Sequence, residues 1–236
     1  MSDKIKARND WYEDADKYWE TVDSSDNGML GGLLFVNHPD IKDSSKMIQN
    51  LLETRFKRKE KEANSEQHSE LYALDCGAGI GRVTKNLLSK YFDKVDMVEQ
   101  NSKFVSEAKT SNLKQLTDSG IVVNFFNFGL QDFTPMPSKY DVIWCQWVLS
   151  HLTDDDLVGF FKRCVTGLKP NGVICVKENT CSTDYIVDNK DSSVTRSLAV
   201  YESIFKRARL RILETRLQSG FPKTLFRVRM WVLSPT

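Results

Sequence analysis

The chain has 236 residues, enough for one domain with a sizeable core, and a formal net charge of +1, which excludes a strong field favouring nucleic acid or a membrane surface. Its five cysteines lie mostly in apolar runs without C-x-x-C spacing, which predicts reduced, buried thiols in an intracellular protein and no metal site. The polar N-terminus has no signal-peptide pattern, and no apolar run is long enough to span a bilayer.

The first predicted element is a helix over Asp10–Glu20. Trp11, Ala15, Tyr18 and Trp19 recur at helical spacing, with acidic residues between them. Two interpretations stay open. The favoured one is an amphipathic helix that packs its aromatic side chains on the domain, and the other is a lid whose aromatic side chains line a pocket.

A glycine-rich stretch follows at Asn27–Gly32, and it is too rich in glycine for the interior of a helix or strand. It predicts a tight turn close to another surface, with Met29 and Leu30 pointing inward. Residues Ser44–Phe56 then follow a helical pattern with one apolar face.

A run of mixed charges at Arg55–Glu70 predicts a solvated helix end and a flexible linker. A basic patch for nucleic acid is the alternative, but interleaved glutamates weaken it. We therefore assign residues 1–70 to an N-terminal helical extension with a lid and linker, packed on a core of residues 71–236.

The core opens with the stretch Leu71–Gly81, L-Y-A-L-D-C-G-A-G-I-G, which predicts a strand, a glycine-rich turn and a helix. Apolar residues run into Asp75, three glycines alternate at 77, 79 and 81, and Arg82 opens a helical pattern. Glycines are needed where backbone bends sharply and a ligand approaches closely, and a helix N-terminus attracts anions. This turn is therefore a candidate cofactor cradle.

The residues around the turn favour S-adenosylmethionine over a dinucleotide. The dinucleotide fingerprint is G-x-G-x-x-G, whereas the spacing here is G-x-G-x-G, with Arg82 in place of the third glycine. Asp75 is a poor neighbour for a pyrophosphate, but suits a ligand with an ammonium group. Glu99 lies 22 residues after Gly77, at a distance typical of an acid that binds ribose hydroxyls. A nucleotide-binding loop of another type is the alternative.

Helices and strands alternate after this turn. The expected order is helix Arg82–Tyr91, strand Val95–Glu99, helix Ser102–Leu113, strand Ile121–Phe126, strand Tyr140–Trp147, a helix capped at Thr153 and ending at Gly167, turn Leu168–Gly172 and strand Val173–Lys177. Such alternation predicts an α/β fold with a doubly wound, Rossmann-like parallel sheet.

The last third departs from this rhythm. We expect a loop at Glu178–Ser193, a helix at Val194–Ala208 and an antiparallel hairpin of Leu210–Leu217 with Leu225–Leu233. A mostly parallel sheet that ends in a reversed hairpin strand is the plan of the class I methyltransferases.

Ligands in such sheets bind beyond the carboxyl ends of the strands. Candidates there are Leu130 and Gln131 for an adenine ring, Gln146, Trp147 and His151 after one strand, and Asn179 after the next. Asn179 is either a ligand for an amine or a loop-forming residue. Asp188 and Asp191 form either an acidic lip for a cationic substrate or, through Asp191 or Ser192, a helix cap.

Several stretches together resemble the α-N-terminal X-Pro-Lys protein methyltransferases, a class I family that uses S-adenosylmethionine. They are Y-W at 18–19, G-M-L-G-G at 28–32, L-D-C-G-A-G-I-G-R at 74–82, V-D-M-V-E at 95–99, G-L-Q-D-F-T-P at 129–135, Y-D-V-I-W-C-Q-W-V at 140–148, H-L-T-D at 151–154 and D-S-S-V-T-R at 191–196. The resemblance runs from about Trp11 to the C-terminus.

The resemblance implies methylation of the α-amino group of proteins beginning X-Pro-Lys after removal of Met, with S-adenosylhomocysteine as product. The cofactor residues would be Gly77, Gly79, Arg82, Glu99, Leu130, Gln131 and Gln146. The peptide would meet Trp19, Leu30, Trp147, Asp188 and Ser193, and the catalytic residues would be Asp191, His151 and Asn179. Cytoplasmic and nuclear residence is expected, with no direct binding of nucleic acid or membrane.

Two departures from the family pattern bear on substrate choice. Leu33 stands where the family often has an aromatic residue, and Pro222–Phe226 contains Lys223 and Thr224 where the family often has a glutamate. Two rival readings stay open: a class I methyltransferase of another amine or protein site, and a non-catalytic binding subunit with this fold.

Overall fold

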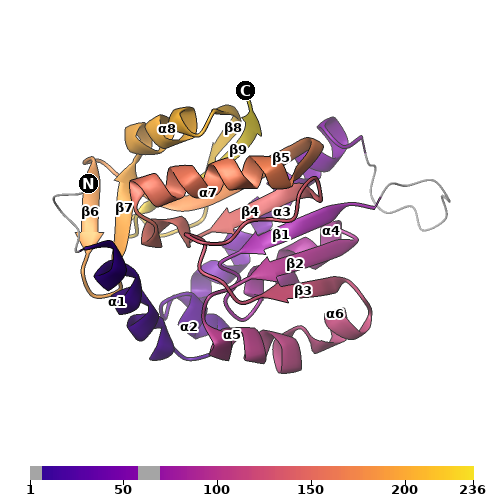
Figure 1. Cartoon of the computed structure of the whole chain (residues 1–236), viewed down its shortest axis with the longest axis horizontal. Helices are drawn as coiled ribbons and strands as arrows, with labels where there is room; N and C mark the ends of the chain where they lie inside the picture. The colour runs from indigo at the N-terminus through magenta and orange to yellow at the C-terminus, as the bar shows by residue number, and fades with distance from the viewer. Residues whose placement is uncertain (1–6, 58–69) are drawn as a thin grey trace.

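The computed structural model describes residues 7–57 and 70–236, which build one nine-stranded sheet flanked by helices (Figure 1). The strands are β1 (Tyr72–Cys76), β2 (Lys94–Val98), β3 (Val122–Phe126), β4 (Tyr140–Gln146), β5 (Leu168–Cys181), β6 (Tyr185–Asp188), β7 (Ser193–Ser197), β8 (Leu210–Leu217) and β9 (Arg227–Pro235). Their order is β3-β2-β1-β4-β5-β7-β6, and β9 pairs with β5 and β8. Strands β1 to β5 pair in parallel, whereas β9 is antiparallel to both of its neighbours. The doubly wound sheet with a reversed C-terminal hairpin is confirmed.

Helices cover both faces of the sheet (Figure 1). The α-helices are α1 (Arg8–Glu20), α2 (Asp26–Met29), α3 (Asn37–Thr54), α4 (Ser89–Tyr91), α5 (Ser102–Glu107), α6 (Lys114–Asp118), α7 (Asp154–Gly167) and α8 (Leu198–Arg207). Two short 3-10 helices are η2 (Leu34–Val36) and η5 (Leu149–His151), and two short π-helices are η3 (Thr84–Leu88) and η4 (Ala108–Asn112). Within residues 7–57 and 70–236, no helix combines the length and apolarity needed to cross a membrane.

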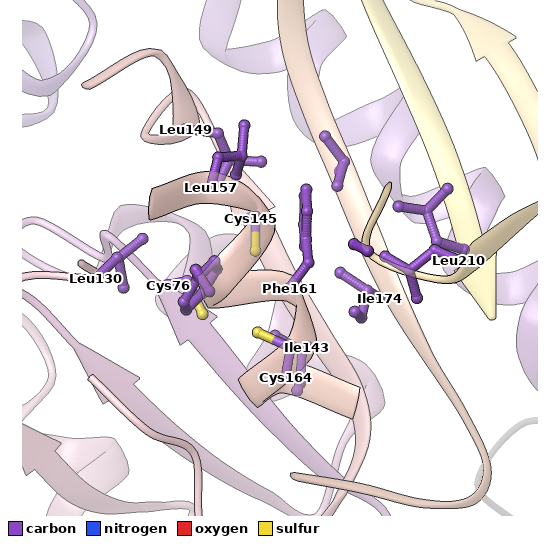
Figure 2. Close-up of a cluster of buried hydrophobic side chains, with 14 of the residues drawn as sticks. Cys76, Leu130, Ile143, Cys145, Leu149, Leu157, Phe161, Cys164, Ile174 and Leu210 are labelled. Atoms are coloured by element: carbon purple, nitrogen blue, oxygen red, sulfur yellow. The ribbon is translucent and has the colours of Figure 1, made fainter. Parts of the chain in front are cut away.

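Successive side chains of a strand point to opposite faces, and this alternation divides the core into layers. Leu74 and Cys76 of β1 pack with α7 and α8, whereas Ala73 packs with α3 on the other face. Figure 2 shows the first of these clusters, in which Phe161 of α7 meets Ile143 and the neighbouring strand residues. All five cysteines are free thiols, and four of them are buried.

The helix α3 begins at Asn37, earlier than the expected start at Ser44. Pro39 lies in its first turn, where a missing backbone donor costs nothing. Met47 and its neighbours on one face of α3 are buried against β1 and β4. The division of the chain at residue 70 into extension and core stays an interpretation, and the charged linker falls largely on residues 58–69, outside the described residues.

The residues expected to form a turn before β5 form a bulge inside it instead. Between the pairs Tyr140–Leu168 and Val142–Val173 the register slips, and Asn171 adopts a φ of +67°. The strand also continues past its expected end to residue 181.

The expected loop Glu178–Ser193 and helix Val194–Ala208 are wrong in their boundaries. Two short strands, β6 and β7, pair there as an antiparallel hairpin. The helix α8 begins only at Leu198, where Ser197 Oγ accepts a hydrogen bond from the Val200 amide.

The N-terminus of α7 joins three parts of the fold. Thr153 Oγ1 accepts from the Asp156 amide at 3.2 Å, which confirms the expected cap. Asp156 also accepts a hydrogen bond from Tyr12 Oη of α1 at 2.7 Å, and Asp154 accepts one from Arg196 Nε of β7 at 2.8 Å. The acidic first turn therefore anchors α1 and the β6–β7 hairpin against the core, in addition to complementing the helix dipole.

Candidate active site

The glycine-rich turn between β1 and the next helix has a backbone that only glycine adopts without strain. Gly77, Gly79 and Gly81 have φ values of +65°, +56° and +82°. A Cβ on Gly79 would stand 2.5 Å from the sulfur of Met29, and one on Gly77 would overlap Val148. The glycines are therefore required both by the conformation and by the close approach of neighbouring segments.

Two carboxylates frame this turn. Glu99 Oε2 accepts from the Gly79 amide at 2.9 Å, so the acid after β2 lies directly beside the turn. Asp75 accepts from Thr84 Oγ1 at 2.6 Å, and burial raises its pKa to about 6 although this hydrogen bond and Arg82 favour the charged form.

A cavity opens above the turn, and all seven residues predicted to bind the cofactor line it: Gly77, Gly79, Arg82, Glu99, Leu130, Gln131 and Gln146. The structure thus brings together segments that are far apart in the sequence, at the carboxyl ends of the strands. Glu99 supplies an acceptor for ribose hydroxyls, and Arg82 supplies a cation for a carboxylate. The polar groups therefore fit S-adenosylmethionine.

The helix α1 both packs on the domain and lines this cavity. Trp11 is fully buried, and its Nε1 donates to the His151 carbonyl at 2.7 Å. Tyr12, Ala15 and Trp19 face the cavity. The two sequence interpretations of this helix are therefore compatible, because one face of α1 does both tasks: Trp11 packs on the domain, and Ala15 and Trp19, four and eight residues further on, line the cavity.

A second cavity adjoins the first, and Trp19, Met29, Trp147 and His151 line both. Seven residues predicted for substrate or catalysis line the second cavity: Trp19, Leu30, Trp147, His151, Asn179, Asp191 and Ser193. Asp188 does not line it. This residue is exposed on β6, but its register opposite Ser193 places both on one face of the hairpin, at the rim.

The second cavity has a polar wall and an apolar wall. The polar wall comes from β5 and the segment leading into β7, and the apolar wall includes Leu33, Phe221, Leu225 and Phe226. Thr224 is exposed and absent from the lining. Sequence reasoning missed Phe221, whose ring lies 6.3 Å from that of Trp147, because nothing local distinguishes it from a core residue.

Trp147 stands at the junction of the two cavities with a φ of +52°, in the left-handed region that costs a bulky residue free energy. Its amide donates to the Lys177 carbonyl at 3.0 Å, and the Arg82 guanidinium lies 5.7 Å from the centre of its ring. The next two amides, of Val148 and Leu149, both donate to Glu178 Oε1 at 2.8 Å. This turn is therefore held in its strained shape by β5.

Glu178 was not predicted as a site residue. It is 1% exposed, lines the second cavity, and has its pKa raised to about 7 by burial, although the two amides favour the charged form. Its signal in the sequence was a charged residue directly after a buried apolar strand, at the edge where ligands bind.

Both ring nitrogens of His151 are engaged. Trp19 Nε1 lies 3.2 Å from Nε2, and the Ser192 carbonyl lies 3.1 Å from Nδ1. An indole N–H can only donate, so Nε2 accepts and Nδ1 carries the proton. Burial lowers the pKa of His151, although the nearby Asp191 charge opposes this, and the ring is therefore neutral near pH 7.

Asp191 offers an acceptor that the protein leaves unused. Its Oδ1 is buried and has no hydrogen-bond partner within the part of the chain that the structure describes. The capping interpretation of Asp191 and Ser192 is wrong, because Ser197 caps α8. Burying an acceptor without a partner costs free energy, so this oxygen is suited to a ligand donor in the second cavity.

Comparison with known proteins agrees with this geometry. Residues 7–234 match the family described as AdoMet dependent proline di-methyltransferase. The chain belongs to this family. It is 44% identical to the Xenopus tropicalis N-terminal Xaa-Pro-Lys N-methyltransferase 1 over 92% of each chain. It is 42% identical to the Arabidopsis thaliana alpha N-terminal protein methyltransferase 1, covering 95% of this chain and 79% of the relative.

A solved structure supports the same assignment. A Leishmania major SAM-dependent methyltransferase superposes with a TM-score of 0.81 at 37% identity, covering 95% of this chain and 83% of that one. The chain is thus a class I methyltransferase that uses S-adenosylmethionine, as the glycine-rich turn predicted.

Proposed function

We propose that this protein methylates the α-amino group of protein N-termini that begin X-Pro-Lys. The observation that carries the proposal is the unpaired Asp191 oxygen in a cavity that shares Trp147 and His151 with the cofactor cavity. The names of the relatives point to the same substrate class.

The first cavity would hold and orient the methyl donor. When bound, S-adenosylmethionine supplies a methyl group on a sulfonium, which an amine lone pair takes in line with the departing sulfur. Glu99 would accept hydrogen bonds from the ribose, Arg82 would bind the carboxylate, and Leu130 and Gln131 would contact the adenine. These contacts come from different strand ends, so together they fix the direction in which the methyl group points.

The acceptor must be a neutral amine. A free α-amino group has a pKa of about 7.7–8.0, so deprotonation near pH 7 costs only about 1 kcal/mol. Asp191 Oδ1 would accept the proton or a hydrogen bond from the amine, and Asn179 would orient the lone pair through its amide oxygen. His151 already uses both nitrogens, so we assign it the task of holding Trp19 and the Ser192 backbone.

The remaining contacts would select the peptide. Trp147 offers a flat face to the second-position proline, and Leu30 and Ser193 border the same cavity. Asp188, at the rim, would attract the third-position lysine. Leu33, together with Leu225 and Phe226 of the departing stretch Pro222–Phe226, makes the opposite wall apolar, so the acidic recognition would come from the β6–β7 side.

Three peptides test this proposal: one beginning Ser-Pro-Lys, one with Ala for Pro and one with Gln for Lys. We expect kcat/KM to fall at least about tenfold for each change, since each removes one selective contact. Asp188→Asn should shrink only the Lys-over-Gln preference, whereas Asp184→Asn, an exposed control before the same hairpin, should not. Equal rates on all three peptides would support a methyltransferase of another amine.

A further inference from the structure

A buried cluster of charged and polar side chains lies behind the cofactor cavity. Asp40 of α3 is fully buried and pairs with two cations: Arg82 Nη1 at 2.8 Å and Lys177 Nζ at 2.5 Å. Gln146 Nε2 donates to both carboxylate oxygens of Asp40, at 2.8 and 3.0 Å. Lys177 is also fully buried, and its remaining donors reach Ser44 Oγ at 2.8 Å and the Asp40 carbonyl at 3.0 Å.

The charges in this cluster do not cancel. Two cations, Arg82 and Lys177, are in contact with one carboxylate. Asp43 is paired with Lys46 at 3.2 Å and Asp75 accepts from Thr84, so neither is in direct contact with the two cations, although the charge of Asp43 acts on Lys177 and that of Asp75 on Arg82. Burial, more than the nearby Arg82 charge, lowers the pKa of Lys177, while Asp40 and Asp43 oppose this.

The surplus positive charge is accessible from the cofactor cavity through Arg82. Lys177 does not line the cofactor cavity, whereas Arg82 and Gln146 do. A buried cation that is only partly compensated gains free energy from an additional anion, and the open side of Arg82 is the side where an anion can arrive.

We propose that Lys177 is a positioning residue for the methyl donor: by sharing Asp40 with Arg82, it leaves Arg82 incompletely neutralised and ready to bind the carboxylate of S-adenosylmethionine. Without Lys177, Asp40 and Arg82 would form a closed, neutral pair with less attraction for an anion. Asp40 in turn fixes the guanidinium, with Asn37 Oδ1 accepting from the same Nη1 at 2.7 Å. The inference rests on the proposed placement of the donor carboxylate on Arg82, and does not involve the peptide.

A structural role alone would predict something different. Lys177 also ties β5 to α3, and a residue that merely joined these elements would, when replaced, weaken binding of every ligand in the cavity. The charge argument predicts instead that only ligands with a carboxylate lose affinity.

The test measures dissociation constants by calorimetry for two probes: S-adenosylhomocysteine and its decarboxylated analogue, which keeps the amine. In Lys177→Met the preference for the carboxylate-bearing probe should fall about tenfold. This is the order of magnitude expected when one positive charge is removed a few ångströms behind Arg82 in a partly screened interior. Affinity for the decarboxylated probe should change less than about twofold. The control Lys139→Met removes a different ion pair, that of Lys139 with Asp96 at 2.6 Å. Neither residue lines the cofactor cavity, so this variant should leave the preference unchanged.

A double variant separates charge from packing. Asp40→Asn with Lys177→Met removes one charge of each sign, so the cluster again carries one positive charge, and the carboxylate preference should return to within about threefold of the original. A structural role predicts that the double variant is worse than Lys177→Met. The proposal is overturned if the single variant weakens both probes equally, if the double variant does not recover, or if the unaltered protein binds both probes alike.

Discussion

Glu178 makes the stability of this protein depend on pH in a direction opposite to that of an ordinary ion-paired carboxylate. Its pKa rises from 4.5 to about 7 because burial disfavours the charged form. Between those values the unfolded chain has released the proton while the folded chain still holds it. The folded state therefore loses stability as pH rises from about 4.5 to 7, by roughly 1.36 kcal/mol per pH unit and about 3 kcal/mol in all.

The variant Glu178→Gln should remove this dependence. Its amide oxygen can still accept from the Val148 and Leu149 amides, so the turn after Trp147 is retained. We expect the free energy of unfolding to exceed that of the unaltered protein by less than about 1 kcal/mol near pH 5 and by about 3 kcal/mol near pH 8.

Urea unfolding at both pH values measures this difference, and the comparison of two proteins at each pH cancels the other titrating groups. Glu202→Gln, which removes the same charge from an exposed position on α8, serves as the control. If the gain from Glu178→Gln is the same near pH 5 as near pH 8, the buried-carboxyl argument fails.

Three further predictions follow from the geometry of the site and core. Gly79→Ala should cost about 1–3 kcal/mol of stability and weaken donor binding, because Gly79 has a positive φ and the new Cβ would stand 2.5 Å from the Met29 sulfur. An unchanged donor affinity by calorimetry would contradict the assignment of this turn to the cofactor. Phe161→Ala should cost about 3–5 kcal/mol in urea unfolding, against less than about 1 for the exposed Leu34→Ala, and similar losses would contradict the core assignment. Asp191→Asn should lower kcat about 100-fold or more while donor affinity changes less than twofold, and full turnover would exclude Asp191 as the base.

Much of the fold could be predicted because local and global signals agree in this chain. The glycines at 77, 79 and 81 require a particular backbone, and the apolar strands that follow are too regular to suggest another class of fold. The cofactor residues were accessible for the same reason: each follows a recognisable strand, and the parallel sheet brings those strand ends to one edge.

The β6–β7 hairpin was missed because its stability is tertiary. Its strands have only four and five residues, and β7, Ser-Val-Thr-Arg-Ser, is mostly polar. The hairpin is held by Arg196, which is fully buried and donates to Asp154 Oδ1 and to the carbonyls of Leu149 and Leu152. An arginine in a polar stretch gives no sign of such burial until the α7 terminus is placed beside it.

The buried charges were missed for a related reason. Asp40 and Lys177 lie 137 residues apart, and each alone has the appearance of a surface residue. Only the packing of α3 on β5 brings them together and excludes water. Burial of charge depends on partners, and a single sequence does not reveal partners at that separation.

Mass spectrometry of two peptides incubated with S-adenosylmethionine shows directly whether the acceptor is an α-amino group. One begins Ser-Pro-Lys with a free amine, and the other is identical but N-acetylated. We expect mass steps of one or more methyl groups on the free peptide and none on the acetylated peptide. Methylation of both peptides would place the methyl group on the lysine side chain and exclude the α-amino group as the required acceptor.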